Sequence, residues 1–192
     1  MQYLILGLFI FLGVHSVRIV ADGWRSAIRA HIGENAFKGL YSLLSLAGLA
    51  LVVWGFGLAR ETPIQLWLPP VGMRHAAALF NTIAFVFLVA AYVPGNAIKA
   101  RVHHPMVLGV KTWAFGHLLA NGNLAHVVLF GSFLVWAVAD FISARRRDRA
   151  QGIVYAAGNA SATAVTVILG VAVAGLFAMW LHGLLIGVKP FG

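Results

Sequence analysis

The residues from Thr163 to Ile186 contain no aspartate, glutamate, lysine or arginine, and this uncharged run is long enough to cross the hydrocarbon core of a bilayer. The rest of the chain has a similar character. Hydrophobic residues make up 61% of it, charged residues make up 10%, and its mean hydropathy is +0.89. This composition is typical of an integral membrane protein. Because lipid cannot hydrogen-bond to bare backbone groups, each crossing segment is expected to be helical, which predicts an all-α membrane bundle.

Apolar segments alternate with short polar loops and predict about six transmembrane helices. They cover approximately Tyr3–Val20, Gly39–Leu58, His75–Val93, Pro105–Leu119, Leu124–Ile142 and Thr163–Ile186. The fourth segment is short and contains Lys111, so its crossing needs a second argument, which the basic residues supply. If all six segments cross and the N-terminus lies outside, most lysines and arginines, including the run from Arg145 to Arg149, fall in inner loops. We therefore expect a single domain, residues 1–192, with both termini outside.

Small residues within the segments are expected to let helix backbones approach closely. The glycines concerned are Gly48, Gly55 and Gly57 in the second segment and Gly170 and Gly175 in the sixth.

Several kinds of chemistry are not indicated by the sequence. The chain has no cysteine, which excludes disulfides, iron–sulfur clusters and thiolate ligation of haem. Its formal net charge is +9, but the basic residues lie in loops between apolar runs and therefore report topology rather than nucleic-acid binding. The acidic residues lie near or beyond the ends of the segments, and no HExxH, Walker-type or GxSxG motif occurs. Zinc hydrolysis, nucleotide hydrolysis and serine esterase activity are therefore not expected.

Histidines inside apolar segments are the best functional candidates, because an ionisable side chain at that depth is costly. His15 lies within the first segment, and Arg18 follows it by three positions. In the fourth segment one helix face carries residues at every fourth position, namely Gly109, Trp113, His117 and Asn121. Such a face, with a small residue, a flat ring and an imidazole, is suited to a planar cofactor, and it is equally suited to packing against another helix.

Haem is the cofactor that this pattern favours, because it needs only one or two neutral imidazoles and an apolar slot. His104 precedes Pro105 and is expected to cap the fourth helix at the inner surface. Two axial nitrogens on one iron lie ~4 Å apart, whereas His104 and His117 are ~20 Å apart along a continuous helix. One of them would have to pair with a histidine from another helix, and His15 is the most deeply placed. A packing role for the same histidines is the alternative.

Three groups of residues at fixed spacing give the chain a family resemblance. They are His15-Ser16-Val17-Arg18; Gly33-Glu34 with Phe37-Lys38-Gly39-Leu40-Tyr41-Ser42; and Arg101, His104-Pro105, Gly109, Trp113, His117, Gly122 and Asn123. With these motifs the chain resembles the NnrU family, membrane proteins related to plant and cyanobacterial 15-cis-zeta-carotene isomerase. The resemblance covers most of the first five segments.

The resemblance implies a cofactor and a setting. The isomerase is known as a haem b protein whose histidine ligands lie in the HS motif and in the W-x-x-x-H motif. These positions are His15 and His117 here, with His104 in reserve. NnrU proteins take their name from a role in nitrite and nitric oxide reduction, which implies a multi-pass protein of the bacterial inner membrane in contact with lipid. A small hydrophobic substrate or nitric oxide would be the partner. The chain lacks a paired histidine after Leu129-Phe130-Gly131, which argues against carotenoid isomerisation.

Two other functions remain open on the sequence. The R-x-HHP-x-x-x-G pattern, from Arg101 to Gly109, also resembles the cofactor-binding motif of isoprenylcysteine and phospholipid methyltransferases, which use S-adenosylmethionine. Those enzymes usually carry a carboxylate pair further along, and no acidic residue follows Asp148 in this chain. The third possibility is a membrane assembly protein without enzymatic activity, in which the histidines only cap and pack.

Overall fold

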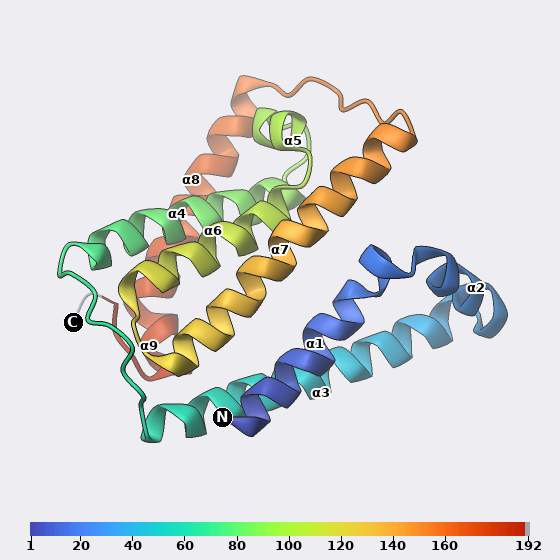
Figure 1. Cartoon of the computed structure of the whole chain (residues 1–192). Helices are drawn as coiled ribbons and strands as arrows, with labels where there is room; N and C mark the ends of the chain where they lie inside the picture. Colours follow the sequence, from blue (N-terminus) through green and yellow to red (C-terminus); the bar gives the residue numbers. More distant parts are fainter. Residues whose placement is uncertain (191–192) are drawn as a thin grey trace.

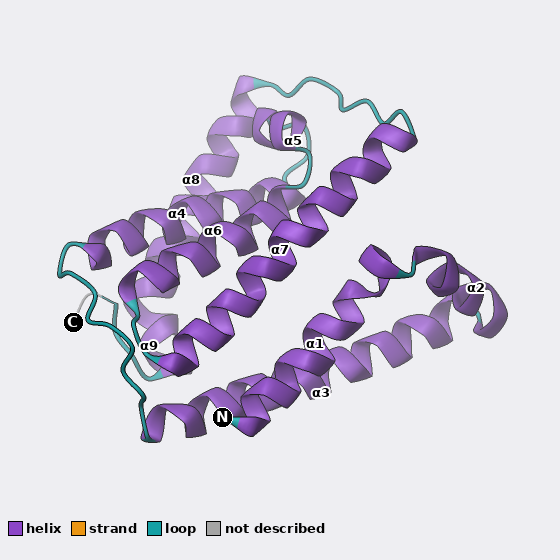
Figure 2. Ribbon diagram, viewed as in Figure 1, coloured by secondary structure: helices purple, strands orange, loops and turns teal. Residues whose placement is uncertain are grey.

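The computed structural model describes residues 1–190, which form an all-helical bundle (Figures 1 and 2). The helices are α1 (Gln2–Val20), α2 (Asp22–Ile32), α3 (Glu34–Glu61), α4 (Met73–Tyr92), α5 (Ala97–Val102), α6 (Pro105–Ala120), α7 (Leu124–Ala150), α8 (Ala160–Leu176), a π-helical turn (Phe177–Leu181) and α9 (His182–Ile186). The only β-type pairing in residues 1–190 consists of two isolated bridges, Gln65 with Asn123 and Asn96 with Asn159. The predicted all-α fold class is confirmed.

Five helices are long and apolar enough to cross a membrane: α1, α3, α4, α7 and the continuous helix Ala160–Ile186. The protein is therefore a multi-pass membrane protein. The fourth predicted segment is the exception, because α6 has 16 residues and spans only ~24 Å, less than the ~30 Å hydrocarbon core. Nevertheless α6 runs antiparallel to α4 along most of its length: Gly109 lies against Ala84, and Gly116 lies against Ala77.

The chain reverses direction from one long helix to the next, so residues 1–190 begin and end at the same end of the bundle (Figure 1). At this end, here called the terminal end, Arg60 Nη2 donates to the carbonyl of Ile186 at 3.1 Å. At the opposite end, here called the basic end, His104 contacts Asp148 and Asn96 pairs with Asn159. A described chain that begins and ends at the same end agrees with the expected even number of passes.

Helix α7 is the centre of the arrangement. The α1–α3 pair lies on one side of it, and α4, α6 and α8 lie on the other (Figure 1). The largest group of buried side chains connects these two sides. It includes Leu4 and Leu8 of α1, Val52 of α3, and Leu129 and Phe130 of α7. Toward the basic end α3 diverges from α7 (Figure 1), whereas α1 stays beside α7, with His15 against Trp136.

Helix α2 was not anticipated, because the sequence between Val20 and Gly39 reads as a polar loop. It is amphipathic and has no buried residue. Asp22 in its first turn pairs with Arg25 at 3.6 Å, while Trp24 is 61% exposed. A helix with a basic face and an exposed tryptophan is typical of one that lies in the membrane interface.

Three of the predicted packing glycines lie at helix contacts: Gly48 and Gly55 against α1, and Gly170 against α4. A methyl group at Gly48 would lie 2.8 Å from the backbone nitrogen of Phe11, so the two backbones are close because no side chain separates them. The prediction is wrong for Gly57 and Gly175. A methyl group at either position would meet nothing within 4 Å, because both are turned away from the neighbouring helices.

Candidate functional site

His15 lies on α1 among aromatic rings. Its Nδ1 donates a 2.7 Å hydrogen bond to the carbonyl of Phe11, one turn earlier. Because a carbonyl can only accept, this bond places the proton of the neutral ring on Nδ1 and leaves the lone pair on Nε2. The ring packs on Phe11 at 4.3 Å between centroids, on Tyr41 at 5.2 Å and on the edge of Trp136 at 6.1 Å.

The indole nitrogen of Trp136 is buried and has no hydrogen-bond partner in the described part of the chain. A buried N–H group without a hydrogen-bond partner is uncommon in proteins, because leaving it unpaired costs free energy. Because Trp136 meets His15 edge-on, an unpaired donor and a free imidazole nitrogen lie in the same region between α1 and α7.

His117 lies on α6 in a similar state. Its Nδ1 donates to the carbonyl of Trp113 at 2.9 Å, which again leaves Nε2 with the lone pair. Its ring packs on Phe130 of α7 at 4.4 Å between centroids and on Trp113 at 5.2 Å. Both histidines thus have the orientation that metal-bound histidines adopt, with one nitrogen held by a backbone carbonyl and the other available.

The face of α6 that the sequence predicted to suit a planar cofactor is divided between two neighbouring helices, α7 and α4. Trp113 and His117 face α7, where both contact Phe130. Gly109 instead lies against α4, because a Cβ there would be 3.0 Å from the carbonyl oxygen of Ala84. Asn121 caps the end of α6 by donating to the carbonyl of His117 at 2.8 Å. Residues four apart on an α-helix are rotated by ~40° about its axis. Over the three steps from Gly109 to Asn121 this rotation adds up, so the two residues lie on different sides of α6.

The structure does not bring His15 and His117 together. Their rings contact α7 at Trp136 and Phe130, positions ~9 Å apart along the helix axis. Phe133 occupies the intervening level, where it contacts Phe11 at 5.8 Å and Trp113 at 5.5 Å between centroids. Aromatic rings therefore fill the space between the two imidazoles. The ligand chemistry of each histidine fits haem, but the spacing of this pair does not fit a single iron in the arrangement described.

A histidine that the sequence analysis left aside, His182, lies beside His117. The two ring centroids are 6.5 Å apart and the planes are inclined by 15°. Nδ1 of His182 donates to the carbonyl of Val188 at 2.6 Å, so its Nε2 also carries the lone pair. His182 follows directly on the π-helical turn Phe177–Leu181, which changes the register of the last helix. No local sequence signal predicts such a turn, so the pairing could not be read from the chain.

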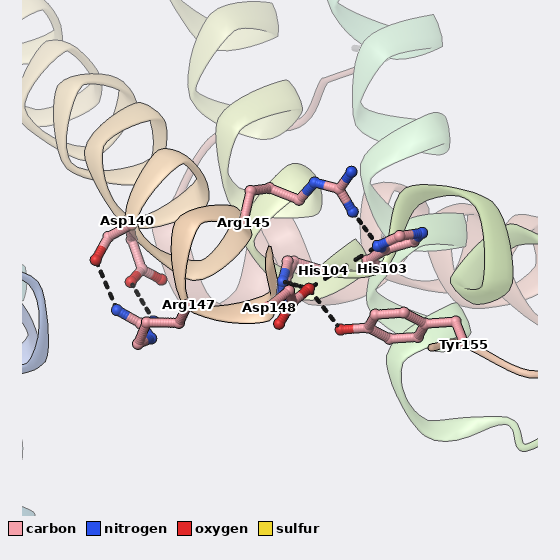
Figure 3. A network of polar contacts seen from close by, with 8 residues as sticks. His103, His104, Asp140, Arg145, Arg147, Asp148 and Tyr155 are labelled. Carbon is pink, nitrogen blue, oxygen red and sulfur yellow. Dashed lines mark hydrogen bonds and ion pairs between the residues drawn. The ribbon is translucent and has the colours of Figure 1, made fainter. Parts of the chain in front are cut away.

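His104 is engaged elsewhere. Its Nε2 lies 2.8 Å from Oδ2 of Asp148, and the hydroxyl of Tyr155 donates to the same oxygen at 3.0 Å (Figure 3). His104 caps α6 at the basic end, as predicted, but the carboxylate that holds it was missed because it is 44 residues away in the chain. This network of His104, Asp148 and Tyr155 connects the α5–α6 corner to α7 and to the loop that follows it.

His103 belongs to the same network and has a strained backbone. Its φ is +68° and ψ is −47°, and the amide of His104 donates to the carbonyl of Val102 at 2.8 Å, which makes a γ-turn of the rare form. Its ring stacks on Tyr155 at 4.0 Å and contacts the guanidinium of Arg145 (Figure 3). Burial and the nearby Arg145 charge lower the pKa of His103 below its usual value.

Arg18 is turned away from His15. Its side chain is 57% exposed and lies 3.9 Å from the carboxylate of Asp22 at the start of α2. No group of three or more histidine, aspartate or glutamate side chains within residues 1–190 is arranged to hold a metal ion. Any metal centre in this region would therefore rest on one or two imidazoles, as haem does.

The family model described as NnrU protein matches residues 3–190, which is nearly the whole chain. No curated protein and no solved structure matches the chain.

Proposed function

Because this chain belongs to the NnrU family, we propose that it is a haem b protein of the bacterial inner membrane that takes part in nitrite and nitric oxide reduction. The observation that carries the proposal is the state of His15 and His117. Each has its Nδ1 proton held by the carbonyl one turn earlier, and each keeps its Nε2 free among aromatic side chains. Neutral imidazoles in an apolar setting are the protein ligands that haem b requires.

His117 is the better supported of the two ligands. A second imidazole, His182, lies with its ring parallel to that of His117 at 6.5 Å between centroids. Two imidazoles on one metal have ring centres ~6 Å apart when each metal–nitrogen bond is ~2 Å, which is close to this separation, and a shared ion requires that both Nε2 atoms turn toward it. His15 is the candidate for binding a separate group. The indole N–H of Trp136, which is unpaired and lies beside His15, supports a bound group there.

When bound, haem iron supplies the ability to bind nitric oxide and to transfer single electrons. The chain supplies the rest. The backbone carbonyls of Phe11 and Trp113 set the tautomer of the ligands, and the rings of Phe130 and Trp113 exclude water from His117. A dry aromatic setting of this kind tunes the potential of a metal centre.

The test is an absorption spectrum of the protein purified in detergent after expression with added haem precursor. We expect a Soret band that shifts on reduction and shifts again when nitric oxide is added to the reduced protein. His117→Ala should remove most of the bound haem, whereas His31→Ala, the control, should retain it. His31 is a suitable control because it is exposed on α2, a helix without buried residues. A folded, colourless protein without iron would overturn the proposal.

A further inference from the structure

A cavity of about 200 Å³ lies between α4, α6 and α7, apart from the histidines discussed above. It is lined by Phe80, Lys111, Thr112, Phe115 and Leu134. Three of these side chains are apolar, and Phe115 is 41% exposed, so the cavity opens on the outer surface of the bundle rather than into its centre. Along the membrane-spanning part of the chain, that surface faces lipid.

Lys111 is the one residue with a full charge in α6. It has no carboxylate within 4.0 Å anywhere in residues 1–190, whereas Arg25, Arg29 and Lys38 near the basic end each pair with an acidic side chain. Lys99 also has a hydrogen-bond partner, because its ammonium donates to the carbonyl of Ala91 at 3.0 Å. Lys111 is therefore a cation in a membrane helix without an ionic partner from its own chain. Such a residue is a functional candidate.

The ammonium of Lys111 is directed toward the basic end. Its Nζ lies 6.0 Å from the ring centre of Phe141, and the same ring is met edge-on by His104 at the start of α6. Lys111 is six positions into α6 from Pro105, or ~9 Å along the axis, and side chains on a helix lean toward its N-terminus. A long lysine side chain in this position brings its charge to the depth of lipid headgroups while its stem stays in the apolar region.

We propose that Lys111 and Thr112 bind the phosphate of an anionic phospholipid from the leaflet at the basic end, and that an acyl chain of this lipid enters the cavity along Phe80, Phe115 and Leu134. The lining is amphipathic in the same sense as a phospholipid, because it combines a cation and a hydroxyl with three apolar side chains. The hydroxyl of Thr112 forms no hydrogen bond within residues 1–190 and is available as a donor. A free phosphate ion would satisfy the polar edge but not the apolar lining. This site does not depend on haem.

The experiment is native mass spectrometry of the detergent-purified full-length protein with phosphatidylglycerol or phosphatidylcholine of identical acyl chains. We expect wild-type protein to retain phosphatidylglycerol at least tenfold better than phosphatidylcholine. Lys111→Gln should remove that preference, Lys111→Arg should keep it, and Leu134→Trp, which fills the cavity, should weaken retention of both lipids. Lys99→Gln is the control, because it removes a positive charge at the same end of the protein outside the cavity and should leave the preference intact.

Two results would overturn the proposal. One is an equal preference in wild type and Lys111→Gln, with Lys111→Gln shown to be folded by its thermal unfolding. If Lys111→Gln does not fold, Leu134→Trp takes its place, and undiminished retention by that variant counts against the cavity. The other is displacement of phosphatidylglycerol by millimolar inorganic phosphate, which would identify a soluble anion as the occupant. Retention unaffected by phosphate supports the lipid.

Discussion

The imidazole rings of His117 and His182 lie nearly parallel, 6.5 Å apart between centroids, although the two residues are 65 positions apart in the chain. Each ring donates its Nδ1 proton to a backbone carbonyl, so two free Nε2 atoms belong to neighbouring histidines. His15, by contrast, is separated from His117 by the rings at the level of Phe133. If one haem takes two axial ligands, His117 and His182 are therefore the better matched pair.

This relationship predicts different spectra for two alanine variants. In the haem-loaded protein, His182→Ala should leave haem bound but convert a six-coordinate, low-spin iron to a five-coordinate, high-spin one, because one axial nitrogen is lost. His15→Ala should leave the spin state unchanged. Electron paramagnetic resonance of the oxidised protein distinguishes the two states. A low-spin signal that survives in His182→Ala and disappears in His15→Ala would assign the axial ligands as the sequence motifs do.

The network at the basic end should contribute measurably to stability. Asp148→Asn removes a carboxylate that is shared by His104 and Tyr155, and its side chain is only 15% exposed. We expect the free energy of unfolding in detergent to fall by about 1–3 kcal/mol, as for hydrogen bonds to a charged group. Tyr155→Phe removes one neutral donor and should cost about 0.5–1.5 kcal/mol. A larger loss for Tyr155→Phe than for Asp148→Asn would contradict this expectation, because it would show that the hydroxyl of Tyr155 contributes more than the carboxylate that accepts from it.

Stability should also depend on the protonation of His103. Burial and then the Arg145 charge lower its pKa in the folded protein, and the opposing effect of Asp148 is smaller. As the pH falls, His103 of the unfolded chain therefore takes up a proton at pH ~6.5, the ordinary pKa of histidine. In the folded protein His103 is protonated only at a lower pH. The contribution of His103 to the free energy of unfolding is therefore fully present above that pH and is lost as the pH falls below it. The midpoint of thermal unfolding should decrease between pH 7 and pH 5.

Variants identify the group responsible for that pH dependence. His103→Asn removes the titrating ring and keeps a residue type that tolerates positive φ, so its midpoint should fall less steeply with acid. His31→Asn replaces an exposed histidine of α2 and serves as the control, with an unchanged slope. Parallel slopes for wild type and His103→Asn would assign the acid sensitivity to another group.

Glycine contacts between α1 and α3 provide a test of the fold with a control in the same helix. A Cβ at Gly55 would clash with the backbone of Leu4, whereas a Cβ at Gly57 would meet nothing within 4 Å. Gly55→Ala should therefore lower the free energy of unfolding by about 1–3 kcal/mol through overpacking. Gly57→Ala should be neutral or slightly stabilising, since alanine favours the helix. Equal effects of the two substitutions would contradict the described contact between α1 and α3.

Local features of this chain could be read from its sequence, and relations between helices could not. The long apolar runs predicted the membrane helices because length and composition are properties of one segment. Pro105 likewise predicted where α6 begins. Helix α2 was missed because its pattern is amphipathic rather than apolar, and α7 extends to Ala150, beyond the predicted Ile142, because arginine and alanine support a helix outside the membrane.

The candidate site shows the same division. The tautomers of His15 and His117 follow from helix geometry one turn back, and both were identified as candidates. Which histidine faces His117 depends on how α6 and α9 pack and on a π-helical turn, neither of which leaves a local signal. Similarly, the spacing from His104 to Asp148 means nothing until α6 and α7 are side by side.

Membrane sidedness is the remaining prediction, and the absence of cysteine in the chain makes it simple to test. Single cysteines at Gln2, Asn35 and Gln151 occupy exposed positions at the terminal end, the start of α3 and the end of α7. With the termini outside, an impermeant thiol reagent added to intact spheroplasts should label Gln2→Cys only. Asn35→Cys and Gln151→Cys should react together after permeabilisation, because α4, α6 and α7 add three crossings to that of α3. Labelling of only one of these two in intact cells would show that short α6 fails to cross.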